Sequence, residues 1–217
     1  MLQRDSVIKI CSEFKISLPK YFWQKIDEYV NLIEGNAEKF GLVAPREVEN
    51  LWRRHILDSL AIFLFYEIER GDNVLDYGSG GGFPGMVLAL ARPGAKFTLA
   101  ESNLKKAEFL KFAAEKVGLE NARILPSRVK SVLKKFDLIT IRATGPLVRT
   151  IPDAIKHIKR EGKIALWIGP KFLQNISYWE NFLAKRKCIV EVEPYPDRWT
   201  EARRLAMAFI GFAKRDF

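Results

Sequence analysis

The sequence predicts a doubly wound α/β domain preceded by a helical N-terminal extension. From Gly71 onward, short apolar runs alternate with segments of helical periodicity. A glycine-rich turn joins the first of these runs to an apolar helix at 86–91, which is the arrangement of a nucleotide-binding edge. The last two runs have no helix between them, so we expect them to pair antiparallel at one edge of a seven-stranded sheet.

The expected strands are apolar and lie between turn or helix signals: one beginning at Asn73, then 96–101, 122–125, 136–141, 162–168, 188–192 and 204–212. The expected helices have apolar residues at steps of three and four: 103–117, 147–158 and 172–185, after three N-terminal helices that include 7–14, 22–33 and a segment starting near Glu47. Residues 35–45 are expected to connect the second and third of these helices. The domain boundary is placed between residues 1–70 and residues 71–217.

The charge of the chain is unevenly distributed. The 217 residues carry a net charge of +10, with 10 Lys/Arg against 11 Asp/Glu in residues 1–70 and 26 against 15 in residues 71–217. A basic module attached to a neutral one suggests a polyanionic partner, of which nucleic acid is the commonest, although a solvated basic surface gives the same composition.

Composition indicates a globular protein, with 48% hydrophobic and 12% aromatic residues. No apolar run approaches the ~20 residues of a membrane span, and the N-terminus lacks the build of a signal peptide. The two cysteines, Cys11 and Cys188, have no metal-binding spacing and are expected to be reduced thiols. We therefore expect a cytoplasmic monomer without a membrane segment or a metal site.

The glycine-rich turn reads Asp-Tyr-Gly-Ser-Gly-Gly-Gly-Phe-Pro-Gly over residues 76–85. Phe83 stands where a dinucleotide-binding G-x-G-x-x-G fingerprint needs its third glycine, which argues against an NAD(P) oxidoreductase. Glycines recur instead at Gly78, Gly80 and Gly82, and Glu101 ends the next strand, where a carboxylate can accept hydrogen bonds from ribose hydroxyls. This combination resembles the S-adenosylmethionine site of Rossmann-like methyltransferases.

His55 and Asp58 lie three residues apart in the third N-terminal helix and so share one face. The simplest interpretation is a partly buried histidine whose ring N–H is satisfied by Asp58. Catalysis by this pair is the alternative.

Four stretches together resemble one family: 54–60 (Arg-His-Ile-Leu-Asp-Ser-Leu), 76–85, 127–129 (Ser-Arg-Val) and 142–143 (Arg-Ala). They are similar in order and spacing to the bacterial small-subunit ribosomal RNA guanine-N7 methyltransferases, once called glucose-inhibited division protein B. The resemblance runs from about Tyr21 to the end. It implies a Rossmann-like class I S-adenosylmethionine-dependent methyltransferase fold and methyl transfer to N7 of a guanine in 16S rRNA, on rRNA or on the small ribosomal subunit.

Carried over by motif, the resemblance implies that the cofactor meets Gly78, Gly80 and Phe83 in the loop, with Val129 and Lys130 beside its adenine. Two departures from the family pattern occur, at 41–43 and at 169–171. The family usually has a small acidic side chain next to the position of Lys130, and with lysine here a backbone N–H could make the contact instead.

Arg142 follows the fourth expected strand and is the candidate for recognising or positioning the target base, since arginine recognises the N7 and O6 acceptors of guanine. It is also assigned to the cofactor site by the resemblance. An ion pair with Asp76 or Glu101 at the strand ends is the structural alternative.

Guanine N7 carries a lone pair at neutral pH and needs no general base, so catalysis would consist of orientation and desolvation. Two other functions are compatible with the sequence: a methyltransferase acting on a protein or a small molecule, and a non-catalytic module that binds rRNA or the ribosome.

Overall fold

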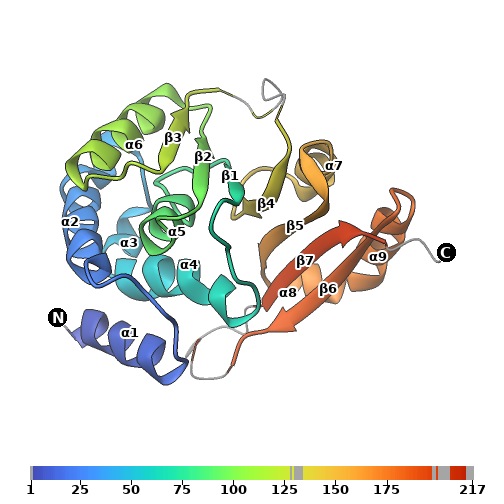
Figure 1. Cartoon of the computed structure of the whole chain (residues 1–217), viewed down its shortest axis with the longest axis horizontal. Coiled ribbons are helices and arrows are strands. Elements are labelled where there is room, and N and C mark those ends of the chain that lie inside the picture. Colours follow the sequence, from blue (N-terminus) through green and yellow to red (C-terminus); the bar gives the residue numbers. More distant parts are fainter. Residues whose placement is uncertain (1, 128, 130–133, 197–198, 200–205, 214–217) are drawn as a thin grey trace.

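The computed structural model describes residues 2–127, 129, 134–196, 199 and 206–213. Within these residues, seven strands form one sheet in the order β3-β2-β1-β4-β5-β7-β6 (Figure 1). The strands are β1 Asn73–Tyr77, β2 Lys96–Ala100, β3 Ala122–Leu125, β4 Phe136–Ile141, β5 Ile158–Ile168, β6 Cys188–Pro194 and β7 Ala206–Phe212. The first five pair in parallel, and β7 pairs antiparallel with both β5 and β6. The predicted doubly wound α/β fold is therefore confirmed.

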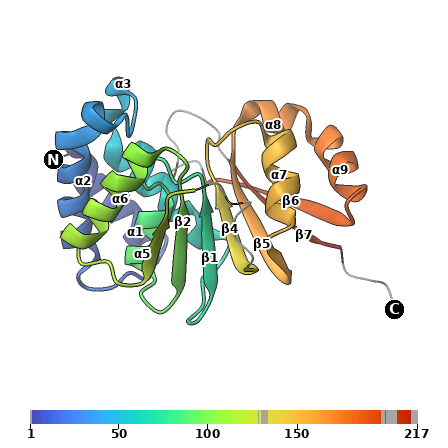
Figure 2. The same cartoon turned by 90° about the horizontal axis from the view of Figure 1, so that it is seen from above.

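Both faces of the central strands are buried, which explains why these strands are almost continuously apolar. Along β4, Leu138 belongs to the hydrophobic core on one face, whereas Ile139 and Ile141 belong to the core on the other. Val74 and Leu75 of β1 divide between the two cores in the same way. Figure 2 shows α2, α5 and α6 on one side of the sheet and α7, α8 and α9 on the other.

The helices that follow β1, β2, β4 and β5 begin at the carboxyl edge of the sheet, which holds the glycine loop. They are α5 Gly85–Ala91, α6 Leu104–Lys116, α7 Leu147–Ile155 and α8 Pro170–Gln174, and α9 Ile176–Ala184 comes directly after α8. Asn103 caps α6 by accepting a hydrogen bond from the backbone N–H of Lys106 at 3.2 Å. The predicted helix at 172–185 is two helices, α8 and α9, interrupted at Asn175. The fifth strand begins four residues earlier than predicted, because a register shift between Phe136 and Leu138 lets extra residues of β5 continue the pairing.

The N-terminal segment begins with α1 Leu2–Glu13 and α2 Phe22–Phe40. The predicted connection from residue 35 was wrong, since α2 continues through Gly35 and ends at Gly41, whose φ of 60° provides a left-handed C-cap. Burial of Ile33 and Ala37 on the same helix face outweighs the cost of about 1 kcal/mol for a glycine in a helix interior. α2 contacts α5 and α6, so this segment shares one core with the sheet.

The predicted third helix is a series of short turns: α3 Pro45–Val48, the π-helix η1 Trp52–Leu57, α4 Asp58–Leu60 and the 3-10 helix η2 Ala61–Leu64. A π-helical turn adds a residue between hydrogen-bonded groups and is frequent at functional sites. Here it contains Arg54 and His55, and both accept a hydrogen bond from Arg142, the residue that follows β4.

Candidate functional site

The glycine loop and Glu101 are joined by a direct hydrogen bond at the carboxyl ends of β1 and β2. The backbone N–H of Gly80 donates to Oε2 of Glu101 at 2.8 Å, and that of Asn103 donates to Oε1 at 2.6 Å. The Glu101 side chain is buried, and each carboxylate oxygen keeps capacity for a further donor. The structure thus brings together the two features that the sequence predicts for a nucleotide site.

The glycines of the loop differ in what surrounds them. A Cβ added to Gly80, whose φ is +55°, would meet no heavy atom closer than the Gly78 carbonyl oxygen at 4.0 Å. A Cβ added to Gly78 would lie 2.2 Å from Oγ1 of Thr144, which follows β4. Gly80 therefore leaves space beside the backbone for a ligand, whereas Gly78 allows the β4 loop to pack against the glycine loop.

Asp76, the last buried residue of β1 before this loop, fixes the start of α5. Its Oδ2 accepts from the Gly85 N–H at 3.2 Å, and its Oδ1 accepts from Oγ1 of Thr140 at 2.8 Å. Burial raises the pKa of Asp76 to about 6, against the lowering effect of these hydrogen bonds. A Cβ on Gly85 would come within 2.5 Å of Oδ2, so the glycine at this position is required for the contact.

Phe83 is buried between two aromatic rings of the N-terminal segment. Its ring centroid lies 4.7 Å from that of His55 and 5.6 Å from that of Tyr29. The Tyr29 hydroxyl donates to the Gly81 carbonyl, which ties α2 to the glycine loop. The side chain of Phe83 thus contributes packing, and a cofactor contact at this position would involve its backbone.

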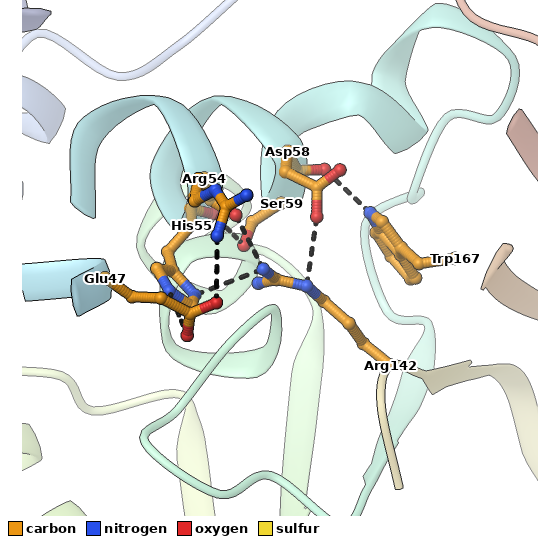
Figure 3. Close-up of polar contacts among 7 residues, drawn as sticks. All are labelled: Glu47, Arg54, His55, Asp58, Ser59, Arg142 and Trp167. Carbon is orange, nitrogen blue, oxygen red and sulfur yellow. Dashed lines mark hydrogen bonds and ion pairs between the residues drawn. The ribbon is translucent and has the colours of Figure 1, made fainter. Parts of the chain in front are cut away.

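Arg142 extends from the end of β4 into the π-helical turn (Figure 3). Its Nε donates to Oδ2 of Asp58 at 3.0 Å, and its Nη2 donates to the Arg54 carbonyl at 2.6 Å and to Nδ1 of His55 at 3.1 Å. The alternative of an ion pair with Asp76 or Glu101 was wrong, because the ion pair of Arg142 is made with Asp58 from the N-terminal segment. Nη1 of Arg142 has no hydrogen-bond partner among the residues that the structure describes.

The His55–Asp58 pairing expected from their spacing was also wrong. The π-helical turn directs the two side chains apart, with Asp58 toward Arg142 and Nε2 of His55 3.6 Å from Oε2 of Glu47 (Figure 3). Because Nδ1 accepts from Arg142, the neutral ring carries its hydrogen on Nε2. Burial, together with the charges of Arg142 and Arg54, lowers the pKa of His55 to about 3, which keeps the ring neutral.

Asp58 is a buried carboxylate whose charge is matched by Arg142. Burial raises the pKa of Asp58, and the neighbouring Arg142 guanidinium opposes this rise. The Asp58 carbonyl also accepts from Nε1 of Trp167 in β5 at 2.7 Å (Figure 3). One helical turn is thus held by side chains from two central strands.

The remaining predicted site residues are Val129 and Lys130. Val129 is buried in the hydrophobic core that also contains Leu75 and Ala100. Lys130 lies outside the described residues.

The arrangement fits S-adenosylmethionine. The cofactor needs space beside the backbone, and the open side of Gly80 offers it. Its ribose hydroxyls need an acceptor, and the Glu101 carboxylate at the adjacent strand end has unused lone pairs. The described residues contain no group of three or more His, Cys, Asp or Glu side chains that could hold a metal ion, and no described helix is long and apolar enough to cross a membrane.

Sequence reasoning missed Tyr29 and Thr144. Tyr29 was visible as a residue on the apolar face of α2, but nothing local indicates that its hydroxyl reaches Gly81. Thr144 lies in a polar loop without periodicity, and its contact with Gly78 depends on how the loop after β4 folds back. The sequence predicts that a helix starts near Glu47, but it does not indicate that Glu47 lies beside His55.

Comparison with known proteins agrees with this geometry. Residues 23–193 match the family model GidB, described as rRNA small subunit methyltransferase G. Proteins named ribosomal RNA small subunit methyltransferase G are 35% identical over 153 residues in Sorangium cellulosum (68% of this chain, 64% of that protein) and 37% identical over 149 residues in Coxiella burnetii (68% and 71%). The relative in Clostridium perfringens is 29% identical over 199 residues (87% and 83%).

Solved structures with the same fold include a SAM-dependent O-methyltransferase from Thermotoga maritima. It has a TM-score of 0.61 and 20% identity, with 79% of this chain and 72% of that chain covered. A ribosomal protein L11 methylase from Lactobacillus delbrueckii subsp. bulgaricus has a TM-score of 0.57 and 20% identity, with 73% and 77% covered. These likenesses show the class I methyltransferase fold.

Proposed function

Since the chain belongs to the GidB family of small-subunit rRNA methyltransferases, we propose that it transfers a methyl group from S-adenosylmethionine to N7 of a guanine in 16S rRNA. The observation that supports this proposal is the hydrogen bond between Gly80 and Glu101 at the carboxyl edge of the sheet, where the two residues would hold the cofactor. The net charge of +11 in residues 71–217 favours a polyanionic substrate.

The reaction does not require the protein to accept or donate a proton. The bound cofactor supplies an electrophilic methyl group on a sulfonium sulfur. The N7 lone pair forms the new N–C bond while the C–S bond breaks, and the electron pair of that bond remains on sulfur. No proton leaves N7, so no general base is needed, and the residues at this edge act by aligning the two reactants and excluding water.

We propose that Arg142 positions the guanine through one hydrogen bond rather than through a bidentate pair. Two of its nitrogens, Nε and Nη2, already donate to the N-terminal segment, which leaves Nη1 without a partner among the described residues. Because Nη1 is buried in this structure, an incoming guanine would have to displace what covers it; Nη1 donating to O6 would then hold the base while the N7 lone pair stays available for the methyl group. This role is compatible with the requirement that N7 cannot accept from arginine and attack carbon at once.

The residues proposed to hold the cofactor are Gly78, Gly80 and Glu101, with Val129 and Lys130 beside the adenine and the backbone of Phe83 in the loop. Glu101 would bind the ribose, and Gly80 would let the ligand approach the main chain. We further propose that the protein acts as a cytoplasmic monomer. Sedimentation of the purified protein at micromolar concentration tests the oligomeric state.

The function is tested by incubation with methyl-labelled S-adenosylmethionine and one of four acceptors: protein-free 16S rRNA, small ribosomal subunits, ribosomal proteins or a small-molecule extract. We expect label in 16S rRNA, as free or assembled substrate, and 7-methylguanosine after nucleoside digestion and mass spectrometry. Gly80→Val is the matched control that should lose transfer. Label in protein or in a small molecule would contradict the proposal, and rRNA binding without transfer would indicate a non-catalytic binding module.

A further inference from the structure

A basic groove lies at the edge of the sheet opposite to the glycine loop. Its lining residues come from the start of β5, the residues before β4 and β6, and the end of β7; they are Lys135, Ile158, Lys159, Arg160, Arg186, Lys187, Phe212 and Ala213. The groove has a volume of about 750 Å³. Five of these eight side chains are cationic and none is a carboxylate, so the groove is a concentrated positive surface with an apolar floor.

The cations of this basic groove are held in place without losing their charge. The Arg186 guanidinium stacks 3.8 Å from the centroid of the Phe182 ring and donates to the Phe182 carbonyl at 2.7 Å. Lys135 donates from Nζ to the carbonyl of Lys156. Carbonyl partners orient these side chains but leave a positive charge to be satisfied by an anion.

Among the residues that the structure describes, a protein carboxylate pairs with one lining residue. Lys159 pairs with Asp137 at 2.7 Å. Within the described part of the chain, Arg160 and Lys187 have no ion-pair partner, although both side chains are exposed. The anion that this groove suits is therefore external, and it must offer several negative charges spaced along a surface.

Helix α7 connects the basic groove to the proposed methyl-transfer site. It begins at Leu147, shortly after Arg142, and ends at Ile155, three residues before the groove residue Ile158. Arg149, near its start, and Lys156, just past its end, are exposed cations. β4 spans the same distance with 6 residues, which is about 20 Å.

We propose that the basic groove binds the phosphate backbone of the rRNA substrate at a distance from the methylated base, with Arg160 and Lys187 as its principal phosphate contacts. This rests on the proposed function. A nucleic-acid backbone supplies closely spaced phosphates that can satisfy several of these cations together. The groove thereby contributes affinity and orientation, while the glycine edge carries the chemistry.

The test compares three proteins: wild type, Arg160→Glu with Lys187→Glu, and the control Lys9→Glu with Lys20→Glu. The control makes the same change in net charge on two exposed lysines of the N-terminal segment. Affinity for a 16S rRNA fragment is measured from 50 to 300 mM salt, S-adenosylmethionine affinity by calorimetry, and kcat and KM for methyl transfer with the same fragment. Arg160→Gln with Lys187→Gln provides a milder variant should the charge reversal fail to fold.

We expect the groove variant to bind rRNA at least tenfold more weakly at low salt and to lose about 1 from the log–log salt slope for each phosphate contact removed. KM for RNA should rise, with kcat and cofactor affinity unchanged. Equal losses in the control variant, or a groove variant with unchanged RNA affinity, would overturn the inference while leaving the proposed function intact. Wild-type protein that binds no rRNA would overturn both. Loss of cofactor binding in the groove variant would mean that the groove supports the fold.

Discussion

Arg142 at the end of β4 donates from Nε to Oδ2 of Asp58 over 3.0 Å, and this ion pair joins the central sheet to the π-helical turn of the N-terminal segment. Both side chains are largely buried, with relative exposures of 14% and 11%. The position proposed to face the target base is therefore held by a segment that lies outside the sheet. Substitutions in that segment should therefore alter methyl transfer by altering the position of Arg142.

Replacement of Arg142 by alanine should lower methyl transfer strongly and also reduce stability. Removal of one partner leaves Asp58 as an uncompensated buried carboxylate, which typically costs about 3–5 kcal/mol. The double variant Arg142→Ala, Asp58→Asn should recover part of that stability but none of the activity. Urea denaturation and kcat for rRNA measure the two effects separately.

If Arg142 addresses the base, the affinity for S-adenosylmethionine should change little in Arg142→Ala. Arg142→Lys should rescue poorly, because one ammonium cannot donate to Asp58, the Arg54 carbonyl and His55 with the geometry of the planar guanidinium. A parallel loss of cofactor affinity and activity would instead place Arg142 in the cofactor pocket.

The two glycines at the start of the loop should respond differently to alanine. Gly80→Ala should leave the fold nearly unchanged, apart from a backbone cost of about 1–2 kcal/mol at positive φ, and should weaken S-adenosylmethionine binding. Gly78→Ala should destabilise the fold, since its Cβ would lie 2.8 Å from Cβ of Thr144. Thermal unfolding and calorimetry on both variants distinguish these outcomes.

Thr144→Gly provides the control for this comparison. In the double variant Gly78→Ala, Thr144→Gly the added methyl group gains space, and we expect part of the lost stability to return. Unchanged instability would show that the backbone conformation at Gly78, and not the contact with Thr144, excludes alanine. Normal cofactor affinity in a folded Gly80→Ala protein would remove Gly80 from the cofactor site.

Local patterns in the sequence predicted the sheet and the glycine edge well. β3 and β4 occupy the predicted residues, because each is an apolar run between clear turn signals. The carboxylate of Glu101 could be placed near Gly80, since the ends of neighbouring parallel strands meet at one edge. These inferences need only strand direction and order.

The partners of Arg142 could not be predicted in this way. Asp58 is recruited from a segment whose position relative to the sheet is set by tertiary packing of α2 against α5 and α6. The π-helical turn alters the helical spacing, so the rule that residues three apart share a face gave the wrong partner for His55. Helix periodicity describes a regular helix, and the site depends on a departure from it.

Asp76 should make the free energy of unfolding depend on pH, and the substitution Asp76→Asn should remove that dependence. Its folded pKa of about 6 is above the unfolded value of 3.8, so its contribution is fully present below about pH 4 and is lost as the pH rises through 6. Asp76→Asn should therefore gain roughly 2 kcal/mol relative to wild type between pH 4 and pH 7. Thr140 can accept from the new amide, and its hydroxyl can turn toward the Leu75 carbonyl.

Urea denaturation at pH 4 and pH 7 measures this difference. Asp137→Asn is the matched control, because the hydrogen bonds and charge of Lys159 and the hydrogen bonds from Asn73 lower the pKa of Asp137 despite partial burial. Its contribution has the opposite sign, being present above the unfolded pKa and lost as the pH falls. A free-energy difference between wild type and Asp76→Asn that is constant with pH would contradict an Asp76 pKa near 6.

His55 should make the Arg142 network sensitive to acid. Its folded pKa of about 3 is below the ordinary value of 6.5, so its contribution to stability is fully present above about pH 6.5 and is lost as the pH falls toward 3. At pH 5 the loss should be about 2 kcal/mol relative to pH 7.5. His55→Gln, which does not titrate, should lack this loss, and the difference between the two proteins isolates His55 from the opposing effect of Asp76.

The same comparison tests whether His55 acts on activity through Arg142. Protonated His55 cannot accept from Nη2 of Arg142, so acid should release one of the contacts that position this guanidinium. Because the folded pKa of His55 is about 3, we expect kcat for rRNA to fall more steeply in wild type than in His55→Gln only as the pH approaches 3, with S-adenosylmethionine affinity constant in both. Identical pH profiles of kcat, together with the expected difference in stability, would show that His55 supports the fold without influencing the position of Arg142.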